Sequence, residues 1–233
     1  MIPARLAALR ERIARAAERA GREPGEVTLI GVSKTRPGED VRAAFDAGLR
    51  DFGENRIQEA EEKIEALADL RKDGLRWHLI GHLQKNKVRR AAALFDRVHS
   101  LDGVALARRL DAALSQGDPP RPLPVLVQAD LAGEQTKRGI SEAGLEAALQ
   151  ALRELPGLRV EGLMVLPPFE EDPERVRPWF VRLRELRDAL AGGGLLAGRE
   201  LSMGMSHDFE VAIEEGATCI RVGTALFGPR PGP

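Results

Sequence analysis

Short apolar runs alternate with amphipathic segments along nearly the whole chain. The run at 27–33 is almost continuously apolar, which is typical of a parallel-sheet strand buried on both faces. Segment 57–67 instead places Ile57 and Ile64 on one face, at helical spacing. The predicted strands are 27–33, 51–53, 76–81, 97–101, 124–130, 159–165, 200–204 and 218–223. The predicted helices are 4–20, 38–47, 57–67, 86–95, 104–114, 141–155, 173–190 and 207–215.

Regular strand–helix alternation of this kind indicates a parallel sheet covered by helices. A doubly wound open sheet would alternate too, but its usual GxGxxG loop is missing after the first strand, where the chain reads GVSKTRP. No change in composition separates two domains. We therefore predict an α/β fold: a single (β/α)₈ TIM barrel over residues 1–233, with an extra N-terminal helix.

Composition narrows the possible partners and compartments. The formal net charge of -1 argues against a nucleic-acid-binding surface, which usually has a basic excess. No segment reaches the roughly 18 consecutive apolar residues of a membrane span. The N-terminal segment 4–20 carries charges throughout, unlike a signal peptide. We therefore expect a cytoplasmic protein without nucleic-acid or membrane partners, whose one cysteine, Cys219, is a buried thiol.

Lys34 ends the first predicted strand, after seven residues without a charge. A lysine at a strand end can simply extend its ammonium group into solvent. If the amine is partly desolvated, however, its pKa falls, and a neutral amine is what Schiff-base chemistry requires. From this position alone both interpretations stay open.

The last two predicted strands lead into the loops LSMGMSHD and RVGTALFG. Barrels often bind phosphate in the loops after the seventh and eighth strands, through backbone N–H groups and small residues. Hydroxyl groups and glycines that could serve there are Ser202, Gly204, Ser206, Gly223 and Thr224. These residues could also be ordinary turns, with Ser206 as the N-cap of a helix beginning near His207.

Arg221 lies inside the apolar strand TCIRVG. A buried guanidinium needs a partner, because an unpaired buried charge is very costly. The partner could be a carboxylate of the same chain, or a heteroatom of a ligand at the barrel mouth.

Polar residues also gather after the second and third predicted strands. These are Asn55, His78, His82, Gln84 and Lys85. The four histidines do not form an HxH or HExxH motif, so we do not expect a metal site. His78 and His82 are instead expected to pack as polar side chains or to contact a ligand.

Eight sequence strings resemble the pyridoxal phosphate homeostasis proteins of the YggS/PROSC type. They are GVSKTRP, FGENRIQEA, WHLIGHLQKNKVR, VHSLD, TKRGI, GLMVLPP, LSMGMSHDFEVAIEEGAT and RVGTALFG. They run from residue 31 to 228 in the family's order, so the match covers nearly the whole chain. The most specific are LSMGMS and RVGTALFG. The fold of this family is similar to the N-terminal barrel of alanine racemase, a fold-type III enzyme that uses pyridoxal 5′-phosphate (PLP).

The resemblance implies a PLP site in the barrel. Lys34 would form the aldimine with PLP, and Arg221 would face the pyridine nitrogen. The phosphate would be held by Ser206, Gly223 and Thr224. The ring would be contacted by Asn55, and His78 is added to the expected cofactor-binding residues. A fixed arginine cation beside the pyridine nitrogen disfavours pyridinium formation and so weakens the ring as an electron sink.

The alternative function is that of a PLP-dependent racemase or decarboxylase. Two-base racemisation needs an acid or base on each face of the substrate carbon. In alanine racemases these are the lysine and a tyrosine from a C-terminal β-domain. This chain ends about five residues after RVGTALFG, and it contains no tyrosine, although a histidine could act instead. We therefore expect a non-catalytic protein of intracellular PLP (vitamin B6) homeostasis that carries or buffers the cofactor.

Two further expectations concern partners. Apo forms of PLP-dependent enzymes are possible recipients of the cofactor. Since no residue of a second copy is evidently needed, we expect a monomer. A basic cluster after the third predicted strand is either a solvated helix face or a second site for an anion. It consists of Lys85, Lys87, Arg89 and Arg90.

Overall fold

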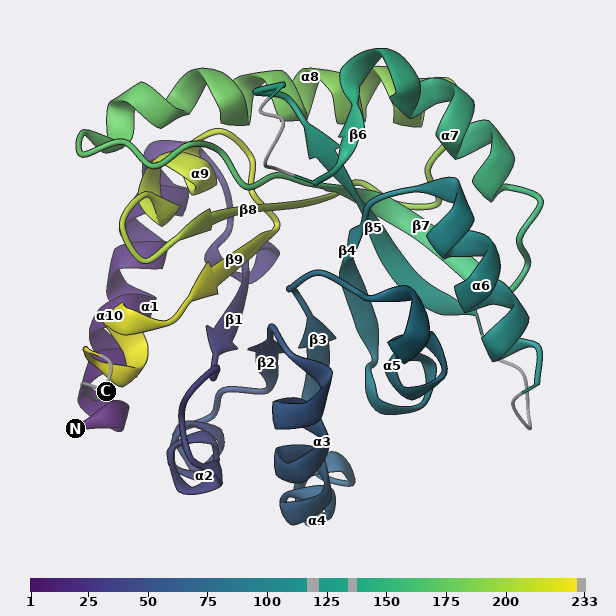
Figure 1. The fold of residues 1–233 in the computed structure, drawn as a ribbon. Coiled ribbons are helices and arrows are strands. Elements are labelled where there is room, and N and C mark those ends of the chain that lie inside the picture. The colour runs from purple at the N-terminus through teal and green to yellow at the C-terminus, as the bar shows by residue number, and fades with distance from the viewer. Residues whose placement is uncertain (117–121, 134–137, 230–233) are drawn as a thin grey trace.

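Parallel strands and surrounding helices make up most of the computed structural model, which describes residues 1–116, 122–133 and 138–229 (Figure 1). The strands are β1 (Thr28–Val32), β2 (Asp51–Glu54), β3 (Arg76–Leu79), β4 (Arg97–Leu101), β5 (Leu123–Asp130), β6 (Ile140–Ser141), β7 (Leu158–Met164), β8 (Glu200–Met205) and β9 (Cys219–Val222). The helices are α1 (Ile2–Arg19), α2 (Gly38–Asp46), α3 (Ile57–Ala66), α4 (Ala68–Arg71), α5 (Val88–Leu94), α6 (Val104–Leu114), α7 (Leu145–Leu152), α8 (Arg177–Gly192), α9 (Phe209–Glu214) and α10 (Thr224–Phe227). Short 3₁₀ turns are η1 (Pro24–Glu26), η2 (Lys85–Lys87), η3 (Glu142–Gly144) and η4 (Pro173–Val176).

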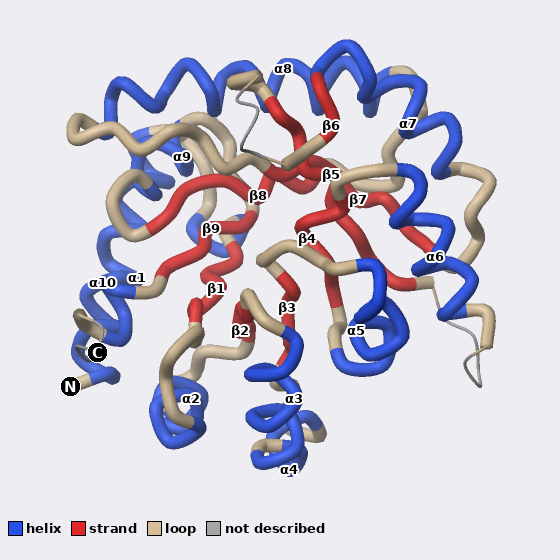
Figure 2. The backbone as a smooth tube through the Cα atoms, in the orientation of Figure 1, coloured by secondary structure: helices blue, strands red, loops and turns tan. Residues whose placement is uncertain are grey.

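Eight of these strands close into a ring. Parallel pairing runs in the order β1, β2, β3, β4, β5, β7, β8, β9, and β9 pairs with β1, so that Ile30 lies opposite Arg221. The two-residue β6 is added beside β5. Figure 2 shows the ring of strands inside the helices. The predicted TIM barrel is therefore confirmed.

The extra N-terminal helix packs against the C-terminal part of the chain. Its buried residues Leu6, Leu9 and Ile13 repeat at helical spacing, and α1 lies beside α9 and α10 (Figure 1). Two ion pairs fix this arrangement, Arg12 to Glu210 at 2.9 Å and Arg19 to Glu214 at 2.7 Å. The N-terminal helix thus covers the place where the ring closes.

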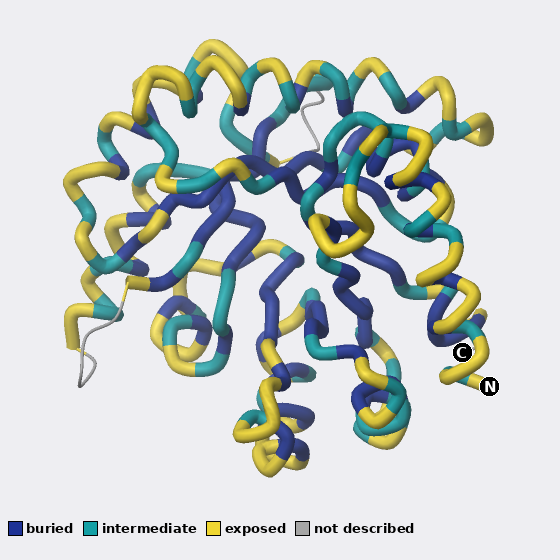
Figure 3. The backbone as a smooth tube through the Cα atoms, turned by 180° about the vertical axis from the view of Figure 1, so that it is seen from behind, coloured by how far each residue is buried: buried dark blue, intermediate teal, exposed yellow. Residues whose placement is uncertain are grey.

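Strand alternation sorts the side chains into two environments. Phe52 and Trp77 pack in a tilted pair with ring centroids 5.9 Å apart, and both are fully buried in the main hydrophobic cluster. Their neighbours Asp51 and His78 point to the other face, into the barrel interior. Most residues of the strands are buried, as Figure 3 shows from behind. The hydrophobic core therefore surrounds an interior that holds polar groups.

Some predicted helices differ from the observed ones at their ends. The helix expected at 57–67 is confirmed as α3, and a short helix, α4, follows it after Leu67. The helix expected at 141–155 is shorter, because Ile140 and Ser141 pair with β5 and a 3₁₀ turn follows them. Among the described residues no helix is both long and apolar enough to cross a membrane. Residues 117–121, within a predicted surface connection, lie outside the described part.

Candidate functional site

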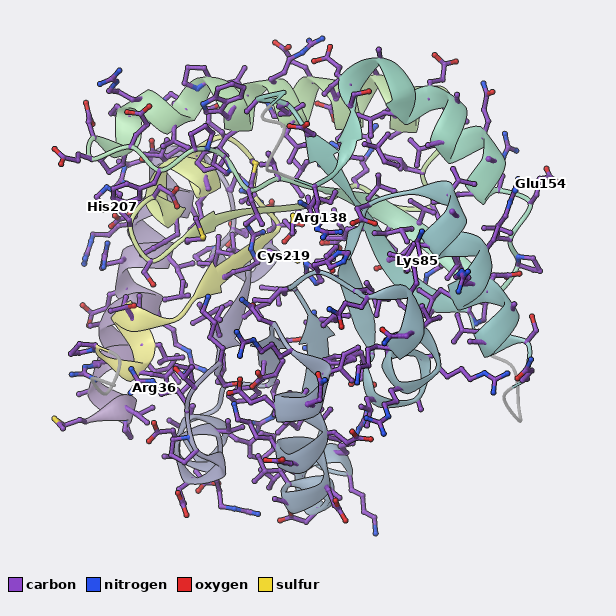
Figure 4. All side chains as sticks on the ribbon, viewed as in Figure 1. Arg36, Lys85, Arg138, Glu154, His207 and Cys219 are labelled. Carbon is purple, nitrogen blue, oxygen red and sulfur yellow. The ribbon has the colours of Figure 1, made fainter. Side chains whose placement is uncertain are left out.

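A cavity of about 790 Å³ opens at the carboxyl ends of the strands. Six of the seven predicted cofactor residues line it, and they come from the loops after β1, β2, β8 and from β9 and its loop. They are Lys34, Asn55, Ser206, Arg221, Gly223 and Thr224. In Figure 4, His207 and Lys85 lie on opposite sides of this end of the barrel, and Arg138 lies between them. The site is thus assembled where barrels carry their functional groups.

The backbone on both sides of Lys34 is fixed by hydrogen bonds. The Ser33 hydroxyl donates to Glu54 at 2.7 Å, and the Ser33 amide donates to the Gly53 carbonyl at 3.1 Å. On the other side, the Thr35 amide donates to a Glu59 carboxylate oxygen at 2.5 Å. Lys34 itself is half-buried. Its position is therefore set by its neighbours on the chain.

A second lysine, Lys63 of α3, holds these groups together. Its Nζ donates to the Ser33 carbonyl at 2.6 Å, to Glu54 at 2.8 Å and to Glu59 at 2.7 Å. The Lys63 side chain is only 9% exposed. We call Lys63, Glu54 and Glu59 the lysine brace, since together they hold the segment that carries Lys34.

Two features of this region are energetically unfavourable. Glu54 is fully buried and one of its carboxylate oxygens has no hydrogen-bond partner among the described residues. Burial raises the pKa of Glu54, although the Lys63 cation opposes the shift. Thr35 has φ of 62°, in the left-handed region that a β-branched residue rarely adopts. Such strain persists only where the surroundings over-determine the backbone, as the lysine brace does here.

The two predicted phosphate loops lie side by side. The hydroxyl oxygen of Ser206 accepts the amide protons of Gly223 at 3.2 Å and of Ala225 at 3.4 Å. Just before Ser206, Gly204 lets the chain pack closely against α9, because its φ is 89° and a Cβ there would lie 2.5 Å from the Cβ of Ala212. The Ser206 hydroxyl, the Gly223 amide and the exposed Thr224 therefore meet at one end of the cavity.

Arg221 is buried in the barrel, with 3% of its surface exposed. Its Nη1 donates to the Ser202 hydroxyl oxygen at 2.6 Å and its Nη2 to the Val165 carbonyl at 2.9 Å. Burial lowers the pKa of Arg221 to about 10, which leaves it a cation at neutral pH. Among the described residues no carboxylate forms an ion pair with Arg221. The carboxylate partner considered from the sequence is therefore not found in this part of the chain.

Asn55 follows β2 and borders the cavity beside Gly81. A Cβ at Gly81 would come within 2.4 Å of the Asn55 carbonyl oxygen, so glycine is needed for this contact between the second and third loops. His82 lines the same cavity and lies 3.2 Å from Asp102.

His78 is not brought to the cavity. It is 3% exposed inside the barrel, with Nε2 at 2.9 Å from Asp51 and Nδ1 at 2.9 Å from His99. Ser202 is likewise fully buried and contacts His99 and Arg221 instead of the loop where phosphate was expected. Both residues lie in strands rather than at strand ends, which accounts for their interior positions.

Several residues at the site were not singled out from the sequence. The lysine brace was missed because Lys63 belongs to a helix whose other residues suggest a solvated face. Gln128, Met205 and the 75% exposed Phe169 also line the cavity. The signal for Gln128 was its place at the end of an apolar strand.

The basic cluster lies on the surface beside the cavity. Lys85, Arg89 and Arg90 are exposed, and Arg90 pairs with Glu61 at 3.3 Å. Within residues 1–116, 122–133 and 138–229, no group of three or more His, Cys, Asp or Glu side chains is placed to hold a metal ion.

Comparison with known proteins gives full-length similarity. The family model described as "Alanine racemase, N-terminal domain" matches residues 4–231. The chain is 47% identical over 226 residues to the "Pyridoxal phosphate homeostasis protein" of Aquifex aeolicus, with 97% of each covered. The structure of PipY from Synechococcus elongatus without PLP shares 41% identity with a TM-score of 0.86, covering 98% of this chain and all of PipY. The structure of PipY with PLP bound shares 40% sequence identity with a TM-score of 0.84, covering 98% of this chain and all of PipY.

Fold and site together define a barrel of the alanine racemase N-terminal-domain class, with a lysine after the first strand and an arginine in the last. Within that class, the chain belongs to the pyridoxal phosphate homeostasis protein family.

Proposed function

We propose that this protein binds PLP and takes part in its homeostasis, carrying or buffering the cofactor without turnover. The observation that carries the proposal is that Lys34, Ser206 and Arg221, distant in sequence, line one cavity. Its volume of about 790 Å³ lies in the usual range for a cofactor pocket. The names of the relatives and the PLP-bound structure of PipY support the same ligand.

Lys34 is the attachment point in this proposal. Its amine adds to the aldehyde of PLP, a carbon–nitrogen double bond forms, and one water leaves. The reaction is readily reversed by water, so the same residue can take up and release the cofactor. The lysine brace keeps the backbone on both sides of Lys34 in place during this exchange.

The remaining residues would orient the cofactor. Ser206, Gly223 and Thr224 suit the phosphate, because a hydroxyl and a backbone amide meet there. Arg221 suits the pyridine nitrogen, since its two side-chain hydrogen bonds among the described residues go to neutral groups and no carboxylate of these residues forms an ion pair with it. Asn55 would lie beside the ring.

Two features favour holding the cofactor over using it. PLP supplies an electron sink when its ring nitrogen is protonated, and the Arg221 cation opposes that protonation. The chain also contains no tyrosine to act as a second base. A carrier needs reversible binding, which Lys34 and the phosphate residues provide.

The test of attachment compares Lys34→Ala with Lys72→Ala, whose lysine is exposed near the amino end of β3, away from the cavity. We expect purified wild-type and Lys72→Ala protein to show the absorption band of lysine-bound PLP and to retain it covalently after borohydride. Lys34→Ala should lose both. An unchanged spectrum and stoichiometry in Lys34→Ala would contradict the proposal.

The test of turnover is deuterium exchange at Cα of a panel of L-amino acids in heavy water. We expect no exchange at catalytic rates in PLP-loaded protein. Exchange at such rates that disappears in Lys34→Ala would make the protein an enzyme and overturn the carrier role.

Three further aspects belong to the same proposal. The protein acts in the cytoplasm, as a monomer, and hands PLP to apo PLP-dependent enzymes. Mixing PLP-loaded protein with an apo-enzyme and following recovery of that enzyme's activity, with sedimentation of the loaded protein, tests transfer and oligomeric state.

A further inference from the structure

A continuous line of buried polar side chains runs through the barrel interior from Arg221 to Asp51. Arg221 bonds to Ser202, Ser202 lies 2.8 Å from Nδ1 of His99, and His99 Nε2 lies 2.9 Å from Nδ1 of His78. The last link is His78 Nε2 to Asp51, at 2.9 Å. We call these five residues the interior column.

The Asp51 end fixes the direction of the first bond. Burial raises the pKa of Asp51, but hydrogen bonds from His78 and Arg76 outweigh it and bring the pKa to about 2. Asp51 is therefore a carboxylate at neutral pH and can only accept. His78 must carry a proton on Nε2 and donate it to Asp51.

The Arg221 end fixes the direction of the remaining bonds. Arg221 has only donors, so the Ser202 oxygen accepts from it, and the Ser202 hydroxyl proton needs an acceptor of its own. The acceptor that the described residues provide is His99 Nδ1. Burial lowers the pKa of His99 well below its ordinary value, and the Arg221 and Arg97 cations add to the shift, so the ring is neutral. Its single proton is then on Nε2 and is donated to His78.

The two ends agree. Each histidine carries a proton on Nε2, and the ring and hydroxyl donors of His78, His99 and Ser202 all meet an acceptor. If His78 carried a second proton on Nδ1 and donated it to His99, His99 would need its own proton on Nδ1, and the Ser202 hydroxyl proton would have no partner among the described residues. Because an unsatisfied buried donor is costly, the bonds have one favoured direction.

We propose that Ser202 and His99 are positioning residues for Arg221, and that the interior column holds its guanidinium toward the cavity while keeping it free of a carboxylate. The nearest negative charge along the column is Asp51, three side chains away and paired with Arg76 at 2.7 Å. Asp208 acts on Arg221 electrostatically without forming an ion pair among the described residues, so the guanidinium keeps donors for the ligand. This inference rests on the proposed contact between Arg221 and the pyridine nitrogen of PLP.

The first experiment uses the cofactor-free wild-type protein. Nitrogen-15 chemical shifts of the histidine rings report which nitrogen carries the proton. We expect His78 and His99 both to be neutral with protonated Nε2 at pH 7.5. A proton on Nδ1 of His99, or a doubly protonated ring in either residue, would overturn the column.

The second experiment uses two substitutions of His99 that keep opposite ends of the column. An asparagine oxygen can take the place of Nδ1 and accept from Ser202, whereas a glutamine amide reaches the place of Nε2 and bonds only to His78. We expect His99→Asn to bind PLP within about threefold of wild type, and His99→Gln to bind about tenfold more weakly. Equal weakening in both, or no weakening in either, would overturn the positioning role.

Ser202→Ala removes the contact to Arg221 directly. Cys219→Ala is its matched control, since Cys219 is also fully buried, lies in β9, and makes no hydrogen bond to the column. We expect Ser202→Ala to weaken PLP binding about tenfold and to shift the pH midpoint of the lysine-bound absorption band, with Cys219→Ala unchanged in both. An unchanged Kd and midpoint in Ser202→Ala would overturn the inference.

The tests separate this inference from the proposed function. If Lys34→Ala loses the cofactor while Ser202→Ala does not differ from wild type, the positioning role of the interior column is contradicted and the proposed function stands. If Lys34→Ala retains a borohydride-stable cofactor, the proposed function itself is wrong.

Discussion

The two sides of the cavity hold their key residues by different means. On the Lys34 side, the lysine brace places one buried cation between two carboxylates. On the Arg221 side, the buried cation is held by a hydroxyl and a backbone carbonyl, which are neutral. Charge pairing fixes the backbone that carries Lys34, whereas Arg221 is held by neutral partners. The difference matches the tasks proposed above, attachment of the cofactor by Lys34 and its orientation by Arg221.

The sharpest test of this contrast is Lys63→Met. It leaves Glu54 buried without its cation, and breaking a buried pair in this way costs about 3–5 kcal/mol. We expect that loss in the free energy of unfolding measured with urea, and no loss in Lys72→Met. Adding Glu54→Gln to Lys63→Met should recover part of the stability. A loss below about 1 kcal/mol would show that the brace is not a tightly coupled charge pair.

The second-largest expected effect is the loss of stability at low pH that Asp51, the last residue of the interior column, causes. Because the pKa of Asp51 is lowered to about 2 in the folded state, it stabilises the protein above the unfolded pKa near 3.8. That contribution, about 2 kcal/mol, is lost as pH falls from about 4 to 2. Urea unfolding at pH 5 and pH 2 should show a smaller decline in Asp51→Asn than in wild type. Equal declines would contradict the shift.

Arg221→Met should behave unlike Lys63→Met. Removing Arg221 breaks two hydrogen bonds to neutral groups but also removes the cost of a buried cation without a carboxylate partner. We expect the unfolding free energy of the cofactor-free protein to change by less than about 1 kcal/mol, while PLP affinity falls. A stability loss as large as that of Lys63→Met would remove the distinction between the two sides.

The smallest expected effect is at Thr35. Asparagine tolerates the left-handed conformation better than threonine, so Thr35→Asn should relieve part of the strain without loosening the unfolded chain. We expect a gain of about 0.5 kcal/mol in the urea unfolding free energy. Destabilisation would mean that the Thr35 side chain makes a favourable contact that outweighs the strain.

The sequence predicted the barrel because its evidence is local. Apolar runs and helical spacing repeat along the chain, and all eight strands were located to within a few residues. The loops after β8 and β9 were predicted together, because barrels often bind phosphate after the last two strands, and they lie side by side in the structure.

Side-chain direction inside the barrel was harder to predict. The direction of His78 could have been predicted from the pattern Trp77, His78, Leu79, because strand alternation puts His78 on the face opposite these two large apolar residues. Its partners Asp51 and His99 come from other strands, and only the register between strands brings them into contact. The same holds for Lys63, whose link to Ser33 spans 30 residues.

Closure of the ring by β1 and β9 has a consequence for synthesis. These neighbouring strands stand near opposite ends of the chain, so that Thr28 pairs with Cys219. During translation, the segment bearing Lys34 leaves the ribosome long before the segment bearing Arg221. A nascent chain therefore has Lys34 but neither Arg221 nor the loop after β9. The proposed site is complete only when β9 has been released, so we expect loading with cofactor to follow synthesis.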